Sequence, residues 1–245
     1  MLQATLTKSA KVTFGVSKLK LSGRMHILLS PLVNELPVIS AVQYGFINPP
    51  DIQLTFTGAV QAITSKLGCV QTALISVIQS SLASMLVLPY RMVMPMDLGS
   101  YDYLDTYQPP VGMVRLTAVE GRGFKVLQKA ILKDIPDIYC LLSLGGSMST
   151  HRPAFRTKTK YDDLTPSWKD ESVDYILYDM DQKIYLEVYD EDATPMDPDD
   201  LLGKAEISVR DLFRTNDDPF AELQLELEVR HIAILGEGKC TNIFC

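Results

Sequence analysis

The stretch Lys183–Gly203, KIYLEVYDEDATPMDPDDLLG, joins a short strand-like run to an acidic loop. Between Asp190 and Asp200, six carboxylates fall within eleven positions, with no Lys or Arg among them. Two unit charges at side-chain spacing repel by about 1 kcal/mol in water, and by roughly 4 kcal/mol at the effective dielectric near a protein surface. Such a concentration of like charge predicts that a positive group neutralises this loop.

The 245-residue chain divides into two parts of different composition. Residues 1–97 carry seven Lys and Arg against three Asp and Glu, which leaves 16 of the 23 basic and 27 of the 30 acidic residues for residues 98–245. The first part is therefore apolar and faintly basic, and the second is strongly acidic. Because the change falls close to the Pro-rich stretch Asp105–Gly112, DTYQPPVG, we predict a domain boundary there.

Short strand-like runs, separated by turn-rich or acidic stretches, fill the acidic part of the chain. They are GMVRLTAVEGRGF, DIYCLLSLGG, AFRTKTKY, KIYLEVYDED and KAEISVRDLF. No convincing helix longer than two turns accompanies them. Several short strands at this spacing predict an antiparallel β-sandwich.

Two stretches in the basic part alternate between apolar and polar residues. KVTFGV contains Val12 and Phe14, and DIQLTFTG contains Ile52, Leu54 and Phe56. A period of two places one face of a strand in an apolar environment, either a packed core or an apolar ligand, and the pattern alone favours the core. No cluster of His, Asp or Ser suited to acid–base or nucleophilic chemistry accompanies these strands, so we expect no enzyme activity.

An uncharged stretch between Lys66 and Arg91 is long enough to cross a bilayer as a helix. Polar residues interrupt it, however, and apolar residues recur at four-residue spacing, at Val70, Leu74, Ile78 and Leu82. This pattern is typical of an amphipathic helix with an uncharged polar face. We therefore predict a buried or groove-lining helix that ends near Pro89, and no transmembrane segment in this chain.

The basic part contains a run, Gly23–Gly58, followed by the uncharged helix and by LVLPYRMVMP, whose Leu-Pro-x-Arg stretch is Leu88–Arg91. In this order it resembles the second half of the SMP domain of extended synaptotagmins and their plant relatives, in which that half leads directly into a C2 domain. The resemblance implies an elongated, curved, β-barrel-like module whose apolar interior holds glycerolipid acyl chains. The implied lining residues are Val12, Phe14, Ile52, Leu54 and Phe56.

Members of that family carry a membrane hairpin and the first half of the SMP domain ahead of the point where this sequence begins. A half barrel would expose unpaired strand edges and its apolar face. The resemblance therefore implies either a truncated chain, which we favour, or an SMP-type dimer partner that supplies the missing half.

Three motifs of the acidic part resemble a C2 domain. PDIYC (Pro136–Cys140) stands where that family has Asp-Pro-Tyr, and TPSWKDE (Thr165–Glu171) where it has Asn-Pro-x-Trp-Asn-Glu. VYDED (Val188–Asp192) stands at the Asp-x-Asp of the third loop. We interpret Trp168, the one tryptophan of the chain, as an anchor of the sandwich core.

The predicted fold class is thus α+β followed by all-β. Residues 1–97 are expected to form the C-terminal half of an SMP-like (TULIP-like) lipid-binding barrel, and residues 98–112 a linker. Residues 113–245 are expected to form a C2 antiparallel β-sandwich.

The resemblance also implies what neutralises the acidic loop. C2 domains of this kind hold calcium between loops 1 and 3, because this hard cation takes six to eight oxygen ligands, which carboxylates in flexible loops supply. The pattern assigns Asp190, Asp192 and Asp200 as ligands from loop 3 and Asp137 as a ligand at the end of loop 1. The alternative is a solvated acidic loop that binds nothing.

Loop 1 makes the implied calcium site incomplete. The position of the usual earlier ligand falls near Gln128 or Ile131, neither of which is a carboxylate. Asp134 is the remaining candidate in that loop. We therefore predict a partial, weaker Ca²⁺ site.

A basic run, HRPAFRTKTKY, interrupts the acidic part, and alternation predicts that Arg156, Lys158 and Lys160 share one face of a strand. In C2 domains the corresponding strand often forms a basic concave patch for phosphoinositides, where each Lys or Arg near an anionic bilayer contributes about 1 kcal/mol. The alternative is an ordinary solvated strand face. Nucleic acid is a poor alternative, because the acidic total opposes phosphate binding.

The function implied by the resemblance is lipid binding and transfer with membrane tethering, on the cytosolic face of contacts between the endoplasmic reticulum and the plasma membrane. The C2 domain would dock on anionic phospholipid, and the SMP remnant would contact acyl chains. The other candidates are a calcium-regulated C2 enzyme, for which we find no catalytic residues, and a C2 adaptor that recruits a protein partner without calcium dependence.

Overall fold

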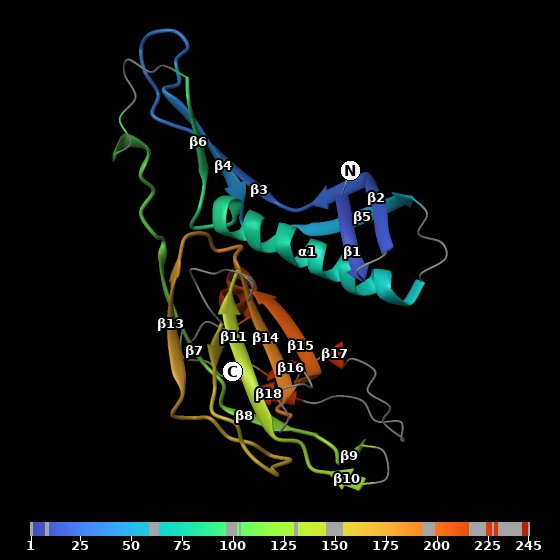
Figure 1. The fold of residues 1–245 in the computed structure, drawn as a ribbon. Coiled ribbons are helices and arrows are strands. Elements are labelled where there is room, and N and C mark those ends of the chain that lie inside the picture. The colour runs from blue at the N-terminus through green and yellow to red at the C-terminus, as the bar shows by residue number, and fades with distance from the viewer. Residues whose placement is uncertain are drawn as a thin grey trace. The chain divides into compact units, whose positions relative to one another are not determined.

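The computed structural model describes residues 2–7, 10–58, 64–96, 102, 104–129, 132–145, 154–192, 199–215, 224–226, 228–229 and 242–244 (Figure 1). They divide into two compact units, with the boundary between Tyr107 and Gln108. Unit 1 precedes this boundary, and unit 2 follows it.

Unit 1 contains two antiparallel sheets and a long helix (Figure 1). The strand order is β1-β2-β5 in the first sheet and β3-β4-β6 in the second. The elements are β1 (Leu2–Thr7), β2 (Ala10–Ser22), β3 (Met25–Leu29), β4 (Ala41–Phe46), β5 (Asp51–Gly58), α1 (Thr64–Leu86), β6 (Met92–Pro95) and the short 3-10 helix η2 (Leu104–Thr106).

A bulge at Ser17 in β2 joins two alternating patterns on one face of the first sheet. Val16 is opposed to Phe56, whereas Leu19 is opposed to Leu54, so the register shifts by one residue between them. Directly opposed residues of an antiparallel pair share a face. The bulge therefore lets an even-numbered and an odd-numbered apolar residue of the same strand lie on the same side.

Helix α1 ends before Pro89, as the sequence predicted. After its last turn, the backbone N–H of Leu88 donates to the carbonyl oxygen of Phe46 at 3.0 Å. A Cβ atom at Gly45 would lie 2.9 Å from the carbonyl oxygen of Leu86, so glycine is required for this close approach of β4 to the end of the helix.

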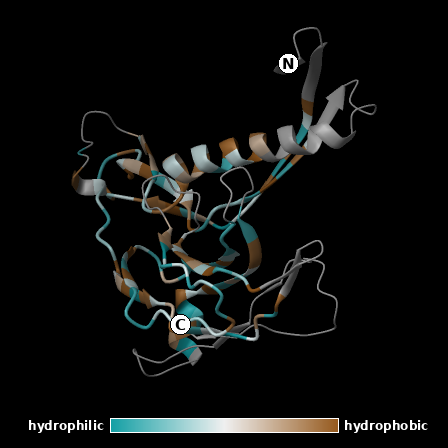
Figure 2. Cartoon of the chain, turned by 60° about the horizontal axis from the view of Figure 1, so that its bottom comes forward, coloured by the Kyte–Doolittle hydropathy of each residue, from teal (hydrophilic) through white to brown (hydrophobic). Residues whose placement is uncertain are grey.

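Apolar and polar positions are interleaved along the described part of α1 (Figure 2), and its apolar residues differ in burial, since Ala83 is buried whereas Val77 and Met85 are exposed. Phe46, Ala83 and Val87 are buried together where the helix end meets β4. Within the described residues, no helix has both the length and the apolar character that a membrane span requires.

Unit 2 is a β-sandwich, which confirms the predicted fold of the acidic part. Its largest sheet has five strands in the order β12-β11-β14-β15-β17, and β13 pairs with β7 in a second layer of the core. The elements are β7 (Gly112–Thr117), β8 (Glu120–Arg122), β9 (Leu127–Lys129), β10 (Leu132–Asp134), β11 (Ile138–Leu144), β12 (Phe155–Arg156), β13 (Ser172–Leu177), β14 (Lys183–Asp190), β15 (Asp200–Ser208), α2 (Val209–Thr215), β16 (Gln224–Glu226), β17 (Glu228–Val229) and β18 (Asn242–Phe244).

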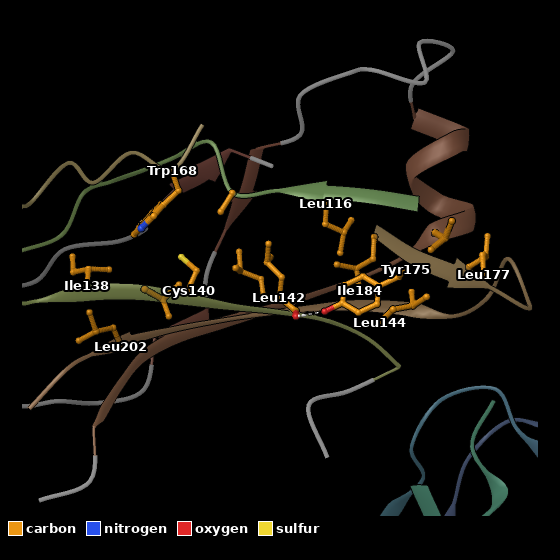
Figure 3. Close-up of a cluster of buried hydrophobic side chains, with 14 residues drawn as sticks. Leu116, Ile138, Cys140, Leu142, Leu144, Trp168, Tyr175, Leu177, Ile184 and Leu202 are labelled. Atoms are coloured by element: carbon orange, nitrogen blue, oxygen red, sulfur yellow. Dashed lines mark hydrogen bonds between the residues drawn. The ribbon is translucent and has the colours of Figure 1, made fainter. Parts of the chain in front are cut away.

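Alternating side chains of these strands fill one core (Figure 3). Trp168 is 1% exposed within it, which confirms its predicted role, and its indole N–H donates to the carbonyl oxygen of Lys158 at 2.7 Å. The hydroxyl of Tyr175 donates to the carbonyl oxygen of Leu142 at 2.7 Å and accepts the N–H of Phe155 at 3.2 Å. The polar ends of both buried aromatic side chains are thus satisfied by the backbone.

The run KAEISVRDLF is only partly a strand, contrary to the sequence-based expectation. β15 ends at Ser208, and the short helix α2 follows. The Ser208 hydroxyl accepts the backbone N–H of Asp211 at 3.1 Å and donates to its carboxylate at 2.7 Å. The Ser208 hydroxyl thus caps the N-terminus of α2, and the Ser-x-x-Asp spacing was the sequence signal.

Candidate functional site

Two tyrosines and an arginine form a cluster on the face of the large sheet that points away from the core. Tyr139 of β11 is opposed to Tyr189 of β14, and their rings stack at 5.5 Å between centroids and 12° between planes. The guanidinium carbon of Arg156, in β12, lies 3.8 Å from the centroid of the Tyr139 ring. We call Tyr139, Tyr189 and Arg156 the tyrosine–arginine cluster.

Hydrogen bonds connect both ends of the acidic loop to this cluster. At the end of β14, the carboxylate of Glu191 accepts a hydrogen bond from the Arg156 guanidinium at 2.7 Å. Just before β15, the carboxylate of Asp199 accepts the Tyr139 hydroxyl at 2.6 Å and the backbone N–H of Asp192 at 3.1 Å. Arg156 is therefore one positive group that neutralises the loop.

The contacts of the cluster shift the pKa values of its members. Burial, followed by the hydrogen bond to Asp199, raises the pKa of Tyr139 above its usual range. The hydrogen bond from Tyr139 lowers the pKa of Asp199, and hydrogen bonds with Thr159 and then Arg156 lower that of Glu191. Near neutral pH, Tyr139 is thus a neutral donor and both carboxylates are ionised.

The three basic residues predicted to share a face are not equivalent in the structure. Arg156 is opposed to Leu141, whereas Lys160 forms a bridge with Ile138, whose side chain lies in the core. The two pairings differ by one residue in register, so the alternation on which the prediction relied is interrupted between Arg156 and Lys160. Lys158 is exposed, and the buried residue Thr157 separates it from Arg156 in the sequence.

The predicted calcium ligands lie near one another at one end of the sheet. Asp190 is buried, and its carboxylate accepts the backbone N–H of Asp137 at 2.7 Å. The carboxylate of Asp137 accepts the N–H of Asp162 at 2.9 Å, and Asp162 itself has a left-handed backbone with φ of 51°. Asp200 is opposed to Asp190 in the register of β14 and β15.

These residues fit a calcium ion only in part. Among the described residues, no three or more His, Cys, Asp or Glu side chains converge closely enough to hold a metal. Asp134 ends β10, and its side chain lies outside the described residues, as do residues 193–198 of the acidic loop. The described carboxylates of Asp137 and Asp190 are directed instead toward backbone N–H groups.

Sequence reasoning missed Tyr139, Tyr189, Glu191 and Asp199 as members of the site. A signal was available for Tyr189, which alternates with the buried apolar residues of β14, but not for Tyr139, which lies in the nearly continuous apolar run of β11. Their contacts to Glu191 and Asp199 depended on pairing between distant strands, and no local pattern indicates such contacts.

In unit 1, the predicted lining residues lie on a face that is only partly exposed. Ile52 and Leu54 are buried, although Leu21 and Leu19, which are opposed to them on β2, are exposed. The side chains of Val12, Phe14 and Phe56 lie outside the described residues.

The second sheet of unit 1 also exposes apolar side chains, and we call this surface the apolar face. Its rows run across all three strands, with Ile27, Tyr44 and Met92 opposed in one row and Leu29, Val42 and Met94 in the next. Ile27 is 61% exposed, and Leu29 and Met94 are each 50% exposed. Sequence reasoning did not single out this face.

Comparison with known proteins agrees with this architecture. Residues 112–227 match the model of the C2 domain family. The chain is 28% identical over 230 residues to extended synaptotagmin-3 of Homo sapiens, an alignment that covers 89% of this chain and 24% of that protein. It is 26% identical over 236 residues to human extended synaptotagmin-1, covering 92% of this chain and 20% of that protein.

A solved structure described as the SMP domain and two C2 domains of extended synaptotagmin 2 has the same fold, with a TM-score of 0.54 at 21% sequence identity. The similarity covers 95% of this chain and 44% of that structure. The chain thus carries a C2 domain in unit 2. It is a relative of the extended synaptotagmins, and it spans only about a quarter or less of the length of those it matches.

Proposed function

We propose that the chain is a non-catalytic lipid-binding protein that tethers membranes. Unit 1, as the C-terminal half of an SMP-like domain, would hold glycerolipid acyl chains, and the C2 domain would dock on an anionic bilayer. The proposal extends to lipid transfer at contacts between the endoplasmic reticulum and the plasma membrane, with an SMP-type dimer partner. Homology with the extended synaptotagmins over nine-tenths of the chain supports it.

The observation that carries the proposal is the exposed apolar face of the β3-β4-β6 sheet. Large apolar side chains at 39–61% exposure lie on the two strands that flank β4, at Met25, Ile27 and Leu29 of β3 and at Met92 and Met94 of β6. Contiguous apolar surface of this kind costs free energy in water and marks a site of binding. Flexible methionine side chains also suit an acyl chain, which has no fixed shape.

Lipid occupancy tests this proposal directly. The full chain with Ile27→Glu and Leu29→Glu should lose most of the glycerolipid that purifies with the wild type, because a carboxylate opposes an acyl chain at those positions. Native mass spectrometry would measure the occupancy. Val77→Glu, at a position of α1 that is 61% exposed, is the matched control and should retain the lipid. Equal occupancy in all three proteins would contradict acyl-chain binding at this face.

The C2 domain offers a basic contact for a phosphoinositide headgroup. Arg156 of β12 and Lys158, which follows the end of that strand, are exposed, and the ring of Tyr139 lies under the guanidinium. A guanidinium held flat against a ring still presents its N–H groups at its edge to a phosphate. Arg156, Lys158 and, on the neighbouring segment, Lys160 would then attract the anionic surface.

The proposal also includes calcium binding by the C2 domain. When bound, the ion would supply positive charge between the acidic loop and anionic headgroups, with Asp137, Asp190, Asp192 and Asp200 as its candidate ligands and Asp134 as a further candidate from loop 1. Because the described carboxylates form only part of a cup, the affinity should be low, with a Kd on the order of 10⁻⁴ M or weaker.

Calorimetric titration of the chelator-treated full chain with calcium chloride would measure this affinity. The double substitution Asp190→Asn and Asp192→Asn should remove the binding heat, whereas Asp170→Asn, at an exposed turn, should leave it unchanged. Absence of binding heat in the wild type at millimolar calcium would refute the metal site and leave the lipid proposals standing.

A further inference from the structure

We propose that Glu191 is an internal competitor for the headgroup phosphate that Arg156 would bind. The inference rests on the proposed docking of the C2 domain on phosphoinositide. It adds that the chain carries its own carboxylate ligand for the arginine, so that the lipid must displace Glu191 before it can bind.

The geometry of Arg156 is that of an occupied anion site. Its Nη2 atom donates to the carboxylate of Glu191 at 2.7 Å and lies 3.4 Å from the Thr159 hydroxyl, while its planar face covers Tyr139. A carboxylate and a phosphate offer similar oxygen acceptors to the edge of a guanidinium. Glu191 therefore takes the place that a headgroup phosphate would take.

Glu191 can leave without dismantling the rest of the site. Tyr139 is held by the carboxylate of Asp199 at 2.6 Å and by stacking on Tyr189, and neither contact involves Glu191. The backbone N–H of Glu191 donates to the carbonyl oxygen of Asp137 at 2.8 Å, which anchors the main chain while the side chain turns away. A side-chain rotation that gives up the contacts of Glu191 with Arg156 and Thr159 opens the arginine.

The exposure of the pair suits such an exchange. The side chain of Arg156 is 44% exposed and that of Glu191 is 31% exposed, although the Oε2 atom of Glu191 is buried. Exposed ion pairs contribute little to stability, because solvent screens them and side-chain entropy opposes them. The Arg156–Glu191 contact is therefore weak enough for a multivalent phosphate to replace it, yet it lowers the apparent affinity for that phosphate.

The test uses the full chain and phosphatidylcholine vesicles with and without phosphatidylinositol 4,5-bisphosphate, sedimented in the presence of a calcium chelator. Glu191→Gln should bind the phosphoinositide vesicles about three- to five-fold more tightly than the wild type, since one weak competing contact is lost. The matched control is Glu206→Gln, which removes the same charge from an exposed pair with Lys183 at the opposite end of β14.

A second comparison identifies the arginine as the target. The higher vesicle affinity of Glu191→Gln should vanish when Arg156→Ala is added, because the arginine with which Glu191 pairs is then absent. Equal affinities of Glu191→Gln and Glu206→Gln, or a gain that survives Arg156→Ala, would overturn the inference while leaving membrane docking intact. Failure of the wild type and every variant to sediment with the phosphoinositide vesicles would overturn the docking proposal and the inference together.

Discussion

Replacing Trp168 with alanine should lower the free energy of unfolding of the C2 domain by about 3–5 kcal/mol, the usual range for a large buried aromatic side chain. Trp168 is 1% exposed among core residues from both layers of the sandwich, so its removal leaves a cavity. The substitution also leaves the carbonyl oxygen of Lys158 without the indole donor. Urea denaturation of the full chain, followed by far-ultraviolet circular dichroism, would measure the change.

Tyr161→Ala is the control for this experiment, because that aromatic side chain is 68% exposed. It should change the free energy of unfolding by less than about 0.5 kcal/mol. Trp168→Phe should fall between the two, since a ring then fills most of the space without the N–H donor. A loss below about 1 kcal/mol for Trp168→Ala would contradict the core position of this residue.

The fold of the C2 domain could be predicted because its strands follow local rules. In β14, Ile184, Leu186 and Val188 are buried and alternate with half-buried neighbours, as period two requires. The tryptophan motif was also local, and it predicted a core residue. The short helix α2 was missed because its apolar residues continue the pattern of β15, and only the Ser-x-x-Asp spacing separates the two elements.

The candidate site was harder to predict because its contacts join distant parts of the chain. Arg156 and Glu191 are 35 residues apart, and Tyr139 and Asp199 are 60 apart. The charge pattern of the acidic loop predicted a calcium ion as the neutralising group. In the structure, an arginine of the same domain also neutralises the loop. The position of Lys160 was missed for a related reason, since a one-residue register shift cannot be read from alternation.

The apolar face of unit 1 could not be predicted from the sequence for a different reason. β3 alternates exposed Met25, Ile27 and Leu29 with half-buried neighbours, but in the sequence MHILL only His26 is polar, so the run predicts an apolar strand. The same run would arise if that face were packed in a core. Only the three-dimensional arrangement distinguishes these cases, because it shows whether another element covers the strand.

The double substitution Arg156→Ala and Lys158→Ala should weaken binding to phosphoinositide vesicles by about 2 kcal/mol, or roughly thirty-fold. Each basic residue near an anionic bilayer contributes about 1 kcal/mol, and both of these side chains are exposed, Arg156 on β12 and Lys158 just after it. Vesicle sedimentation of the full chain in chelator would give the affinity, so that calcium cannot bridge the acidic loop to the lipid.

A change of net charge alone must be separated from the loss of this particular face. Arg115→Ala combined with Arg210→Ala removes the same two charges from exposed ion pairs on β7 and α2. If general attraction to the anionic surface dominates, both double variants should weaken binding equally, and the headgroup site would be refuted. If the tyrosine–arginine cluster recognises phosphate, only Arg156→Ala with Lys158→Ala should show the large loss. The difference should also shrink on vesicles whose charge comes from phosphatidylserine, because a monoester phosphate exposes oxygens to the guanidinium edge that a phosphodiester lacks.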